Sequence, residues 1–443
     1  MSEASTEPAL AGGEEPRADA ERSSAPRGLV AAFRAMRHRN FRLFFGGQLV
    51  SLIGTWMQMV AQSWLVLKLT NSSIMLGVVS FASYIPILIV ALFAGVVVDH
   101  VDRRRLIIGA QALLMLSAFA LAALTWTGVV RVEYVIVLAA FNGLVSSFDM
   151  PARQAFVVDM VGIDDLPNAI ALNSMIFNGA RTIGPAIAGV LIALTGTAMC
   201  FFLNGVSFLA VIWSLFAMEL PRRVIRLGGG QMLTRLGEGV RYIWTHRASR
   251  TLLLIVALNS GFGVQYSVLV PIFARDILHG GARGYGFLMA AQGVGAVIGA
   301  VWMAWRSGSS DGLRHNLTFG LLCGSLAVMV FGASQSMALS LFAQMLIGAG
   351  VINHMASTNT LLQLFVSDEL RGRVMSIYTL SFIGLAPLGA LLVGYLGERL
   401  SPESAVVICG AISLGCAALL FTQMRLIAVA QTEAVPLPRA VAD

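Results

Sequence analysis

Twelve apolar stretches, each close to the roughly 20 residues that an α-helix needs to cross a lipid bilayer, dominate this sequence. The chain is 57% hydrophobic and 12% charged, whereas soluble domains average about 45–50% apolar and about 25% charged residues. The stretches therefore predict an all-α membrane protein with twelve transmembrane helices. We expect spans at about 41–67, 75–98, 106–127, 133–152, 168–194, 200–219, 251–274, 284–305, 317–333, 338–362, 374–397 and 405–424.

The basic residues indicate how these spans are oriented. Positive residues in short loops stay in the cytoplasm. Of the 30 Lys and Arg, 24 fall on the side of the amino terminus, including Arg153 as a presumed loop residue, and five fall in the opposite loops. The remaining one, Arg181, falls in the middle of a predicted span. The pattern predicts a multi-pass protein of the cell (inner) membrane with both termini cytoplasmic. Since the positive charge follows one membrane face, it does not indicate a nucleic-acid partner.

An internal repeat divides the chain into two halves. Gln154–Asp159 recurs 209 residues later as Gln363–Asp368, with four of six residues identical. Ile183–Leu191 recurs 200 residues later as Ile383–Leu391, and the Leu76-Gly77 pair has a weaker counterpart in Tyr285-Gly286. Six spans separate the copies, so both halves have the same orientation and their symmetry axis follows the membrane normal. This arrangement predicts two six-helix repeats that rock about a shared midplane pocket.

The repeat sets the expected domain boundaries. We expect a disordered cytoplasmic tail at 1–30, six-helix bundles at 31–220 and 251–425, and a second cytoplasmic tail at 426–443. The segment 221–250 is predicted to be a cytoplasmic linker with an amphipathic helix, which either lies at the membrane interface or has a regulatory role. The four cysteines lack metal-ligand spacing, and no metal or cofactor is expected.

Residues after the second span carry a first resemblance to a known family. Gly95-Val-Val-Val-Asp99-His100-Val-Asp102-Arg103-Arg104-Arg105 resembles motif A of the major facilitator superfamily. The resemblance implies that fold, with Gly95 allowing close helix packing. It also implies that Asp99, with Arg103 and Arg104, locks the outward-open state. His100 and Asp102 depart from the family pattern, in which Arg and Gly are usual, and an ordinary stop-transfer turn is the alternative.

The fifth span carries a second resemblance. Gly184-Pro185-Ala-Ile-Ala-Gly189 resembles the antiporter motif of drug:proton exporters, although a generic small-residue packing face would look similar. The segments 148–156 and 368–374 resemble the enterobactin-exporter-like branch of the superfamily. The resemblance covers about residues 40–425 and implies export of siderophores, drugs or similar amphiphiles driven by proton entry.

Proton coupling needs a titratable group. The family's helix-four arginine has no counterpart among Phe141, Asn142 and Gly143. We expect Arg181, a costly charge near the midplane, to pair transiently with Asp149, or else to act as structural glue. His354 is a further candidate, although a lone membrane histidine is more often structural.

The resemblance also implies that the first, fourth, seventh and tenth spans line a central cavity. Amides and aromatic rings without a carboxylate cluster suit an amphiphilic, neutral or weakly anionic small molecule. Any one of these side chains could instead serve interhelical hydrogen bonding. The candidates are Gln58, Gln62, Asn142, Phe148, Asn259, Phe262, Gln265, Tyr266, Asn353 and Asn359.

The sequence argues against an enzyme, because it contains no nucleotide-binding loop, metalloprotease motif or nucleophile elbow. We therefore expect a monomeric exporter whose partners are membrane lipid, a small-molecule substrate and protons. A metabolite importer and a lysolipid or lipid flippase of the same fold are the alternatives.

Overall fold

The computed structural model describes residues 33–219, 232–306 and 310–433. The predicted tail at 1–30 lies outside these residues, as do the first part of the linker, 221–231, and the last ten residues of the chain. Within the described residues the regular structure is entirely helical. Helices are expected here because a chain in lipid must satisfy its own backbone hydrogen bonds.

The first half begins with a short 3-10 helix, η1, at Arg34–Arg37. Six long helices follow: α2 (Arg39–Thr70), α3 (Ser73–His100), α4 (Arg103–Trp126), α5 (Val132–Val161), α6 (Leu166–Thr195) and α7 (Thr197–Phe216).

The second half begins with α8 (Met232–Thr245) and α9 (Arg247–Leu258). The chain continues through η2 (Asn259–Gly263), η3 (Gln265–Leu269), α10 (Val270–Ile272) and η4 (Phe273–Ile277). It ends with α11 (Gly281–Arg306), α12 (Ser310–Ala333), α13 (Met337–Phe365), α14 (Asp368–Gly384), α15 (Ala386–Arg399) and α16 (Pro402–Glu433).

Twelve segments of the described chain are long and apolar enough to cross a membrane, which confirms the predicted number of spans. Two of them are not continuous α-helices. The seventh, Arg247–Ile277, changes from α9 to a π-helix and then to a 3-10 helix, and the eleventh divides into α14 and α15. The two irregular spans meet where a methyl group on Gly389 would lie 1.5 Å from the Gly261 carbonyl oxygen. Only glycine permits such close contact, since it has no Cβ.

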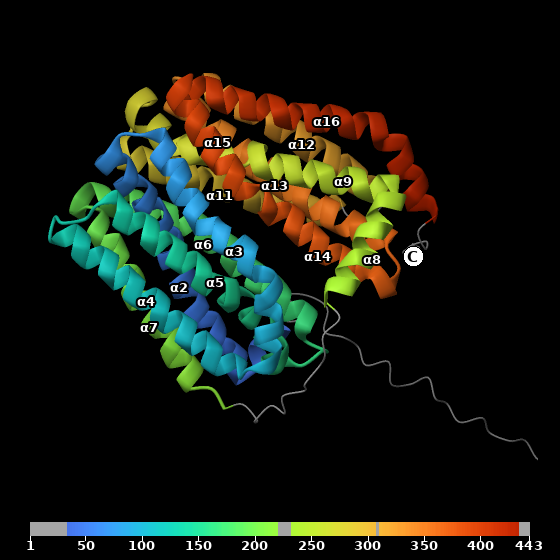
Figure 1. Cartoon of the computed structure of the whole chain (residues 1–443), viewed down its shortest axis with the longest axis horizontal. Coiled ribbons are helices and arrows are strands. Elements are labelled where there is room, and N and C mark those ends of the chain that lie inside the picture. The colour runs from blue at the N-terminus through green and yellow to red at the C-terminus, as the bar shows by residue number, and fades with distance from the viewer. Residues whose placement is uncertain (1–32, 220–231, 307–309, 434–443) are drawn as a thin grey trace, which may run out of the picture.

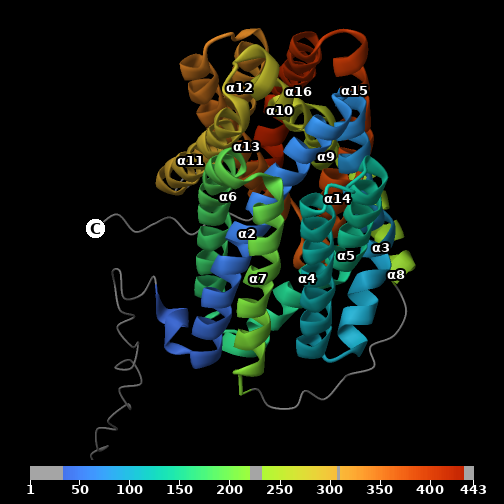
Figure 2. The same cartoon turned by 90° about the vertical axis from the view of Figure 1, so that its left-hand side faces the viewer.

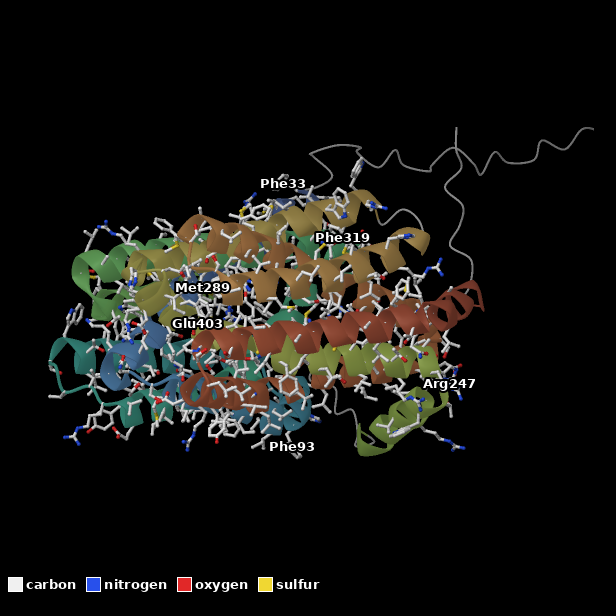
Figure 3. All side chains as sticks on the ribbon, turned by 90° about the horizontal axis from the view of Figure 1, so that it is seen from above. Phe33, Phe93, Arg247, Met289, Phe319 and Glu403 are labelled. Carbon is white, nitrogen blue, oxygen red and sulfur yellow. The ribbon has the colours of Figure 1, made fainter. Side chains whose placement is uncertain are left out.

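The spans form two bundles that lie against each other, α2–α7 and α9–α16, with α8 at the end of the second bundle beside α14 (Figure 1). Figure 2 shows α4 and α7 side by side on one face of the first bundle. Large apolar side chains project from the outside of both bundles. Phe93 and Phe319, which belong to different halves of the chain, are 68% and 55% exposed, and Phe93 lies at the lower edge of the view in Figure 3. A surface of this kind suits contact with lipid.

Two glycine-lined seams join the bundles. In the first, between α6 and α11, a methyl group on Gly189 would lie 2.9 Å from the Gly286 Cα atom. In the second, between α3 and α15, a methyl group on Gly77 would lie 2.6 Å from the Ala390 carbonyl oxygen. Gly77 and Gly286 are the pair that the repeat relates at an offset of 209, so the two seams correspond to each other.

Both seams run to one end of the molecule, which we call the closed end. There, Glu398 Oε2 at the end of α15 accepts hydrogen bonds from Ser73 N at 2.8 Å, Ser73 Oγ at 2.9 Å and Ser72 Oγ at 3.0 Å, at the start of α3. Arg275 donates to the Asn71 side chain at the end of α2. The opposite end, where α8 lies, is called the α8 end.

Candidate functional site

A partly open cavity of about 540 Å³ lies in the α8-end part of the first bundle. Helices α2 to α7 form its wall. Within the described part of the chain, no residue of the second half lines the cavity. It includes three of the predicted cavity residues, Gln58, Gln62 and Asn142, but not Phe148. The wall combines amides and hydroxyls with aromatic and aliphatic side chains, and its volume falls in the range of sites for small organic ligands.

A buried ion pair lies in the cavity wall. Asp149 Oδ2 lies 2.7 Å from Arg153 Nη2, one turn further along α5, and the Asp149 side chain is 6% exposed. Gln111 Nε2 of α4 donates to Asp149 Oδ1 at 3.0 Å, and Arg153 donates to the Gln48 side-chain oxygen of α2. Four side chains from three helices thus form one polar cluster, in which Arg153 and Gln111 contact the Asp149 carboxylate and Gln48 contacts Arg153. Asp149 is the only one of the four that sequence reasoning identified.

Arg153 was assigned to a cytoplasmic loop, and that assignment is wrong. Helix α5 continues to Val161, nine residues beyond the predicted end of the fourth span, so Arg153 lies inside the helix. The expected pairing of Asp149 with Arg181 is absent from this conformation because Arg153, at i+4 on the same helix, already occupies the carboxylate. The i, i+4 spacing was the sequence signal that could have identified the pair.

Arg181 lies midway along α6 and has an aromatic neighbour. Its guanidinium carbon is 5.7 Å from the centre of the Trp56 ring of α2, a distance typical of a cation–π contact. No ion pair among the described residues includes Arg181, and its Nε atom is buried without a hydrogen-bond partner. The next residue, Thr182, lies in the α6–α11 seam, where a methyl group on Gly293 would lie 2.5 Å from Thr182 Oγ1. Arg181 therefore lies between the α6–α11 seam and the cavity wall.

The residues of motif A contact their own half of the molecule. Arg103 lies 3.5 Å from Asp99 and 3.1 Å from Asp159 of α5, and Arg104 donates to the Phe216 carbonyl of α7 at 3.2 Å. Asp102, which departs from the family pattern, accepts a hydrogen bond from Arg105 N at 3.2 Å and so caps α4.

The expected packing role of Gly95 is not found in this conformation. A methyl group on Gly95 would meet nothing within 4 Å, because in this state no neighbouring helix approaches that face of α3. The described contacts of Asp99, Arg103 and Arg104 likewise do not join the two halves.

The glycines of the helix-five motif all contact other helices. A methyl group on Gly184 would lie 2.7 Å from Trp56 Cβ of α2, whereas Gly189 contacts α11 in the other half. The Pro185 carbonyl oxygen would lie 2.5 Å from a methyl group on Gly286. The motif therefore joins α6 both to its own bundle and to the second bundle.

The candidates of the second half are absent from the wall of the 540 Å³ cavity, within the part of the chain that is described. Most of them form hydrogen bonds inside their own bundle. The irregular seventh span and α13 contain buried backbone and amide groups, and buried polar groups need hydrogen-bond partners. Asn259 accepts from Ser413 Oγ at 2.9 Å, and Gln265 donates to the Ser260 carbonyl at 3.0 Å. Asn353 donates to the Ala349 carbonyl at 2.9 Å.

The remaining candidates of this half have similar surroundings. The Tyr266 hydroxyl donates to Gln344 at 2.8 Å and accepts from Gln292 at 3.0 Å. Asn359 accepts from Gln363 at 2.6 Å. Phe262 is half-buried and is not part of either described cavity.

His354 lines a second, much smaller cavity. The cavity measures about 20 Å³, which is room for about one water molecule, and Asn259 and Ser413 also line it. His354 is 1% exposed, and neither ring nitrogen has a hydrogen-bond partner among the described residues. The histidine is thus separate from the wall of the larger cavity.

Comparison with known proteins places the chain in a family. Residues 30–441 match the family described as transmembrane secretion effector. Three similar proteins are the staphyloferrin A transporter of Staphylococcus aureus, the multidrug efflux pump Tap of Mycolicibacterium fortuitum and the enterobactin exporter EntS of Shigella flexneri. They are 25%, 27% and 25% identical over 80%, 78% and 84% of this chain, and over 88%, 86% and 88% of their own lengths.

Solved structures agree on the fold. A bacterial homologue of the human lysosomal transporter Spinster, in an inward-facing and unoccupied conformation, has a TM-score of 0.64 at 14% identity, covering 89% of this chain and 97% of its own. A POT family transporter in complex with 5-aminolevulinic acid has a TM-score of 0.72 at 11% identity, covering 88% and 97%. The family and these relatives are transporters and not enzymes. The chain is a multi-pass membrane transporter that belongs to the transmembrane secretion effector family of the major facilitator superfamily.

Proposed function

We propose that the protein exports small amphiphilic molecules, siderophore-like or drug-like, by alternating access and in exchange for protons. The observation that carries this proposal is the cavity of about 540 Å³, which lies at the α8 end of a molecule whose opposite end is sealed. A siderophore transporter, a multidrug efflux pump and a siderophore exporter are among its relatives.

The charge distribution supports an orientation in which the α8 end faces the cytoplasm. With Arg153 moved into α5, the sequence pattern still assigns 23 of the 30 basic residues to the side on which α2 begins, which is the α8 end. By the positive-inside rule the closed end then faces outward, and the protein lies in the cell membrane with both termini inside. The cavity would accordingly load from the cytoplasm, as an exporter requires.

Alternating access requires a second state in which the closed end opens and the α8 end closes. The contacts that would break when the closed end opens are those of the two seams. Each seam joins a helix of the first half to a helix of the second half through close glycine contacts. Motif A would supply a contact that forms. Asp99 is 68% exposed at the α8 end and thus accessible to the second bundle when that end closes.

Asp149 is the proposed proton site, because it is the carboxylate in the cavity wall. A proton on Asp149 would remove its attraction to Arg153, 2.7 Å away, and would change the charge of the wall by one unit. A cargo whose binding differs between the two charge states would then be coupled to proton movement.

The test measures transport of an uncharged fluorescent amphiphile, dansyl-leucine methyl ester, into everted membrane vesicles. An acid interior should drive uptake by the wild-type protein, and Asp149→Asn should reduce the response to the pH gradient at least tenfold. Glu133→Gln, which changes an exposed acid near the start of the same helix, is the matched control and should behave as wild type. Unaltered dependence on the gradient in Asp149→Asn would refute the assignment of this residue.

A further inference from the structure

The uncompensated charge of Arg181 is the observation that leads beyond the proposed function. The cavity wall contains one acid, Asp149, and Arg153 neutralises it. Arg181 lies one turn beyond the wall residue Phe177 and has no carboxylate partner among the described residues. The cavity wall together with the adjoining Arg181 therefore has an excess of one positive charge.

Such a charge is costly halfway through a membrane span unless a partner compensates it. The Trp56 ring, whose centre lies 5.7 Å from the guanidinium carbon, compensates the charge in part. Tyr84 of α3 and Tyr266 of η3 also lie within electrostatic range of Arg181. Phenol groups and an aromatic face stabilise a cation less than a carboxylate does, and a buried Nε atom remains without an acceptor.

The position of Arg181 suits contact with cargo. Gly184 brings α6 so close to α2 that a methyl group there would lie 2.7 Å from Trp56 Cβ, and this contact fixes the indole beside the guanidinium. The Phe177 ring lies 5.7 Å from the Trp56 ring in an edge-to-face arrangement and forms part of the cavity wall, as does Tyr84. An apolar body in the cavity would thus lie against the Phe177 and Tyr84 rings, and Trp56 and Arg181 follow directly behind Phe177, outside the residues that line the cavity.

We propose that Arg181 binds an anionic group of the cargo, a carboxylate or a similar oxyanion, while Trp56, Phe177 and Tyr84 contact its apolar part. This inference rests on the proposed function and narrows the cargo to amphiphilic anions. A planar guanidinium can form two parallel hydrogen bonds to a carboxylate, which a lysine cannot do.

The test compares binding of two probes to the purified full-length protein in lipid nanodiscs. Dansyl-leucine carries a free carboxylate, and its methyl ester has the same body without the charge. The wild type should bind the acid about ten- to a hundredfold more tightly than the ester. Arg181→Gln should abolish this preference and leave the ester affinity within about twofold. Arg181→Lys should keep an intermediate preference, and Arg131→Gln, at an exposed arginine of the closed end, should keep all of it.

Three results would overturn the inference. The first is a wild-type protein without preference for the acid, including one that binds neither probe. The second is an Arg181→Gln variant that keeps the preference. The third is an Arg181→Gln variant that loses affinity for both probes equally and has a lower melting temperature, which would show that Arg181 stabilises the fold and does not bind cargo. Export itself is tested separately by vesicle uptake of the uncharged ester, so either proposal can fail while the other stands.

Discussion

The hydrogen bonds of Glu398 should hold the closed end shut. Its Oε2 atom accepts four described hydrogen bonds from Ser72, Ser73 and Ile74, two of them from backbone N–H groups at the start of α3. A carboxylate at an exposed helix N-terminus contributes about 0.3–1 kcal/mol, and we allow about as much again for the hydroxyl donors in an exposed setting. Glu398→Ala should therefore favour opening of this end by about 0.6–2 kcal/mol, or about three- to thirtyfold.

The assay uses a cysteine that is hidden while the seam is closed. Met289 of α11 is 7% exposed and lies deep inside the molecule (Figure 3). When opening is rare, the rate at which an external, membrane-impermeant maleimide labels a Met289→Cys variant follows the population of the open state. Glu398→Ala should raise that rate about three- to thirtyfold, and Glu398→Gln should have a smaller effect because the amide still accepts hydrogen bonds.

Glu403→Gln provides the matched control, since Glu403 is a neighbouring acid at the start of α16 (Figure 3). Its labelling rate should equal that of the parent. A labelling rate in Glu398→Ala that also equals the parent would refute the reasoning, because the hydrogen bonds would then contribute nothing to closure.

Three further predictions follow from the packing and the charges. Gly189→Leu places side-chain atoms where even a methyl group would lie 2.9 Å from the Ala282 carbonyl oxygen, so the α6–α11 seam should not close. Vesicle transport should therefore fall at least tenfold, and the labelling rate of Met289→Cys should rise. Tyr266→Phe removes the hydroxyl between Gln292 and Gln344 and should lower the free energy of unfolding by about 1–3 kcal/mol, measured by chemical denaturation in detergent. Asp165, which precedes α6, should stabilise the protein in a pH-dependent way: the hydrogen bond with His38, assisted by Arg34 and Arg37, holds the pKa of this carboxyl below its ordinary value of 3.8 against the effect of desolvation. Because its pKa is lowered in the folded state, that stabilisation is present above the unfolded-state pKa and is lost as the pH falls through the folded-state pKa. The difference in melting temperature between the wild type and Asp165→Asn should therefore be constant above about pH 5 and shrink in stronger acid.

Much of the fold could be predicted because the bilayer imposes strong constraints on sequence. Length and hydropathy alone locate all twelve spans, since lipid leaves the backbone few alternatives to helix. The interruptions in the seventh span were visible as Asn259 and Gln265, but the π-helix there depends on the approach of Gly389 to Gly261. That approach is a tertiary contact between residues more than a hundred positions apart, and no local pattern reports it.

The site was predictable only in part, for a similar reason. Polarity within apolar spans identifies Asp149 and Arg181 as unusual, but it does not choose their partners. The true partners of Asp149 are Arg153, which the predicted helix end excluded, and Gln111 of α4. The expectation that spans of both halves line the cavity came from the family resemblance. In this state, polar residues of the second half form hydrogen bonds with one another instead.

Loss of dansyl-leucine methyl ester from intact, energised cells tests most directly whether the protein exports. Cells that express the wild-type protein should retain less of the probe than cells with an empty vector, and cells that express Asp149→Asn should resemble the vector control. Greater retention in cells with the wild-type protein would contradict the account, because it would mean that the cavity delivers its cargo inward.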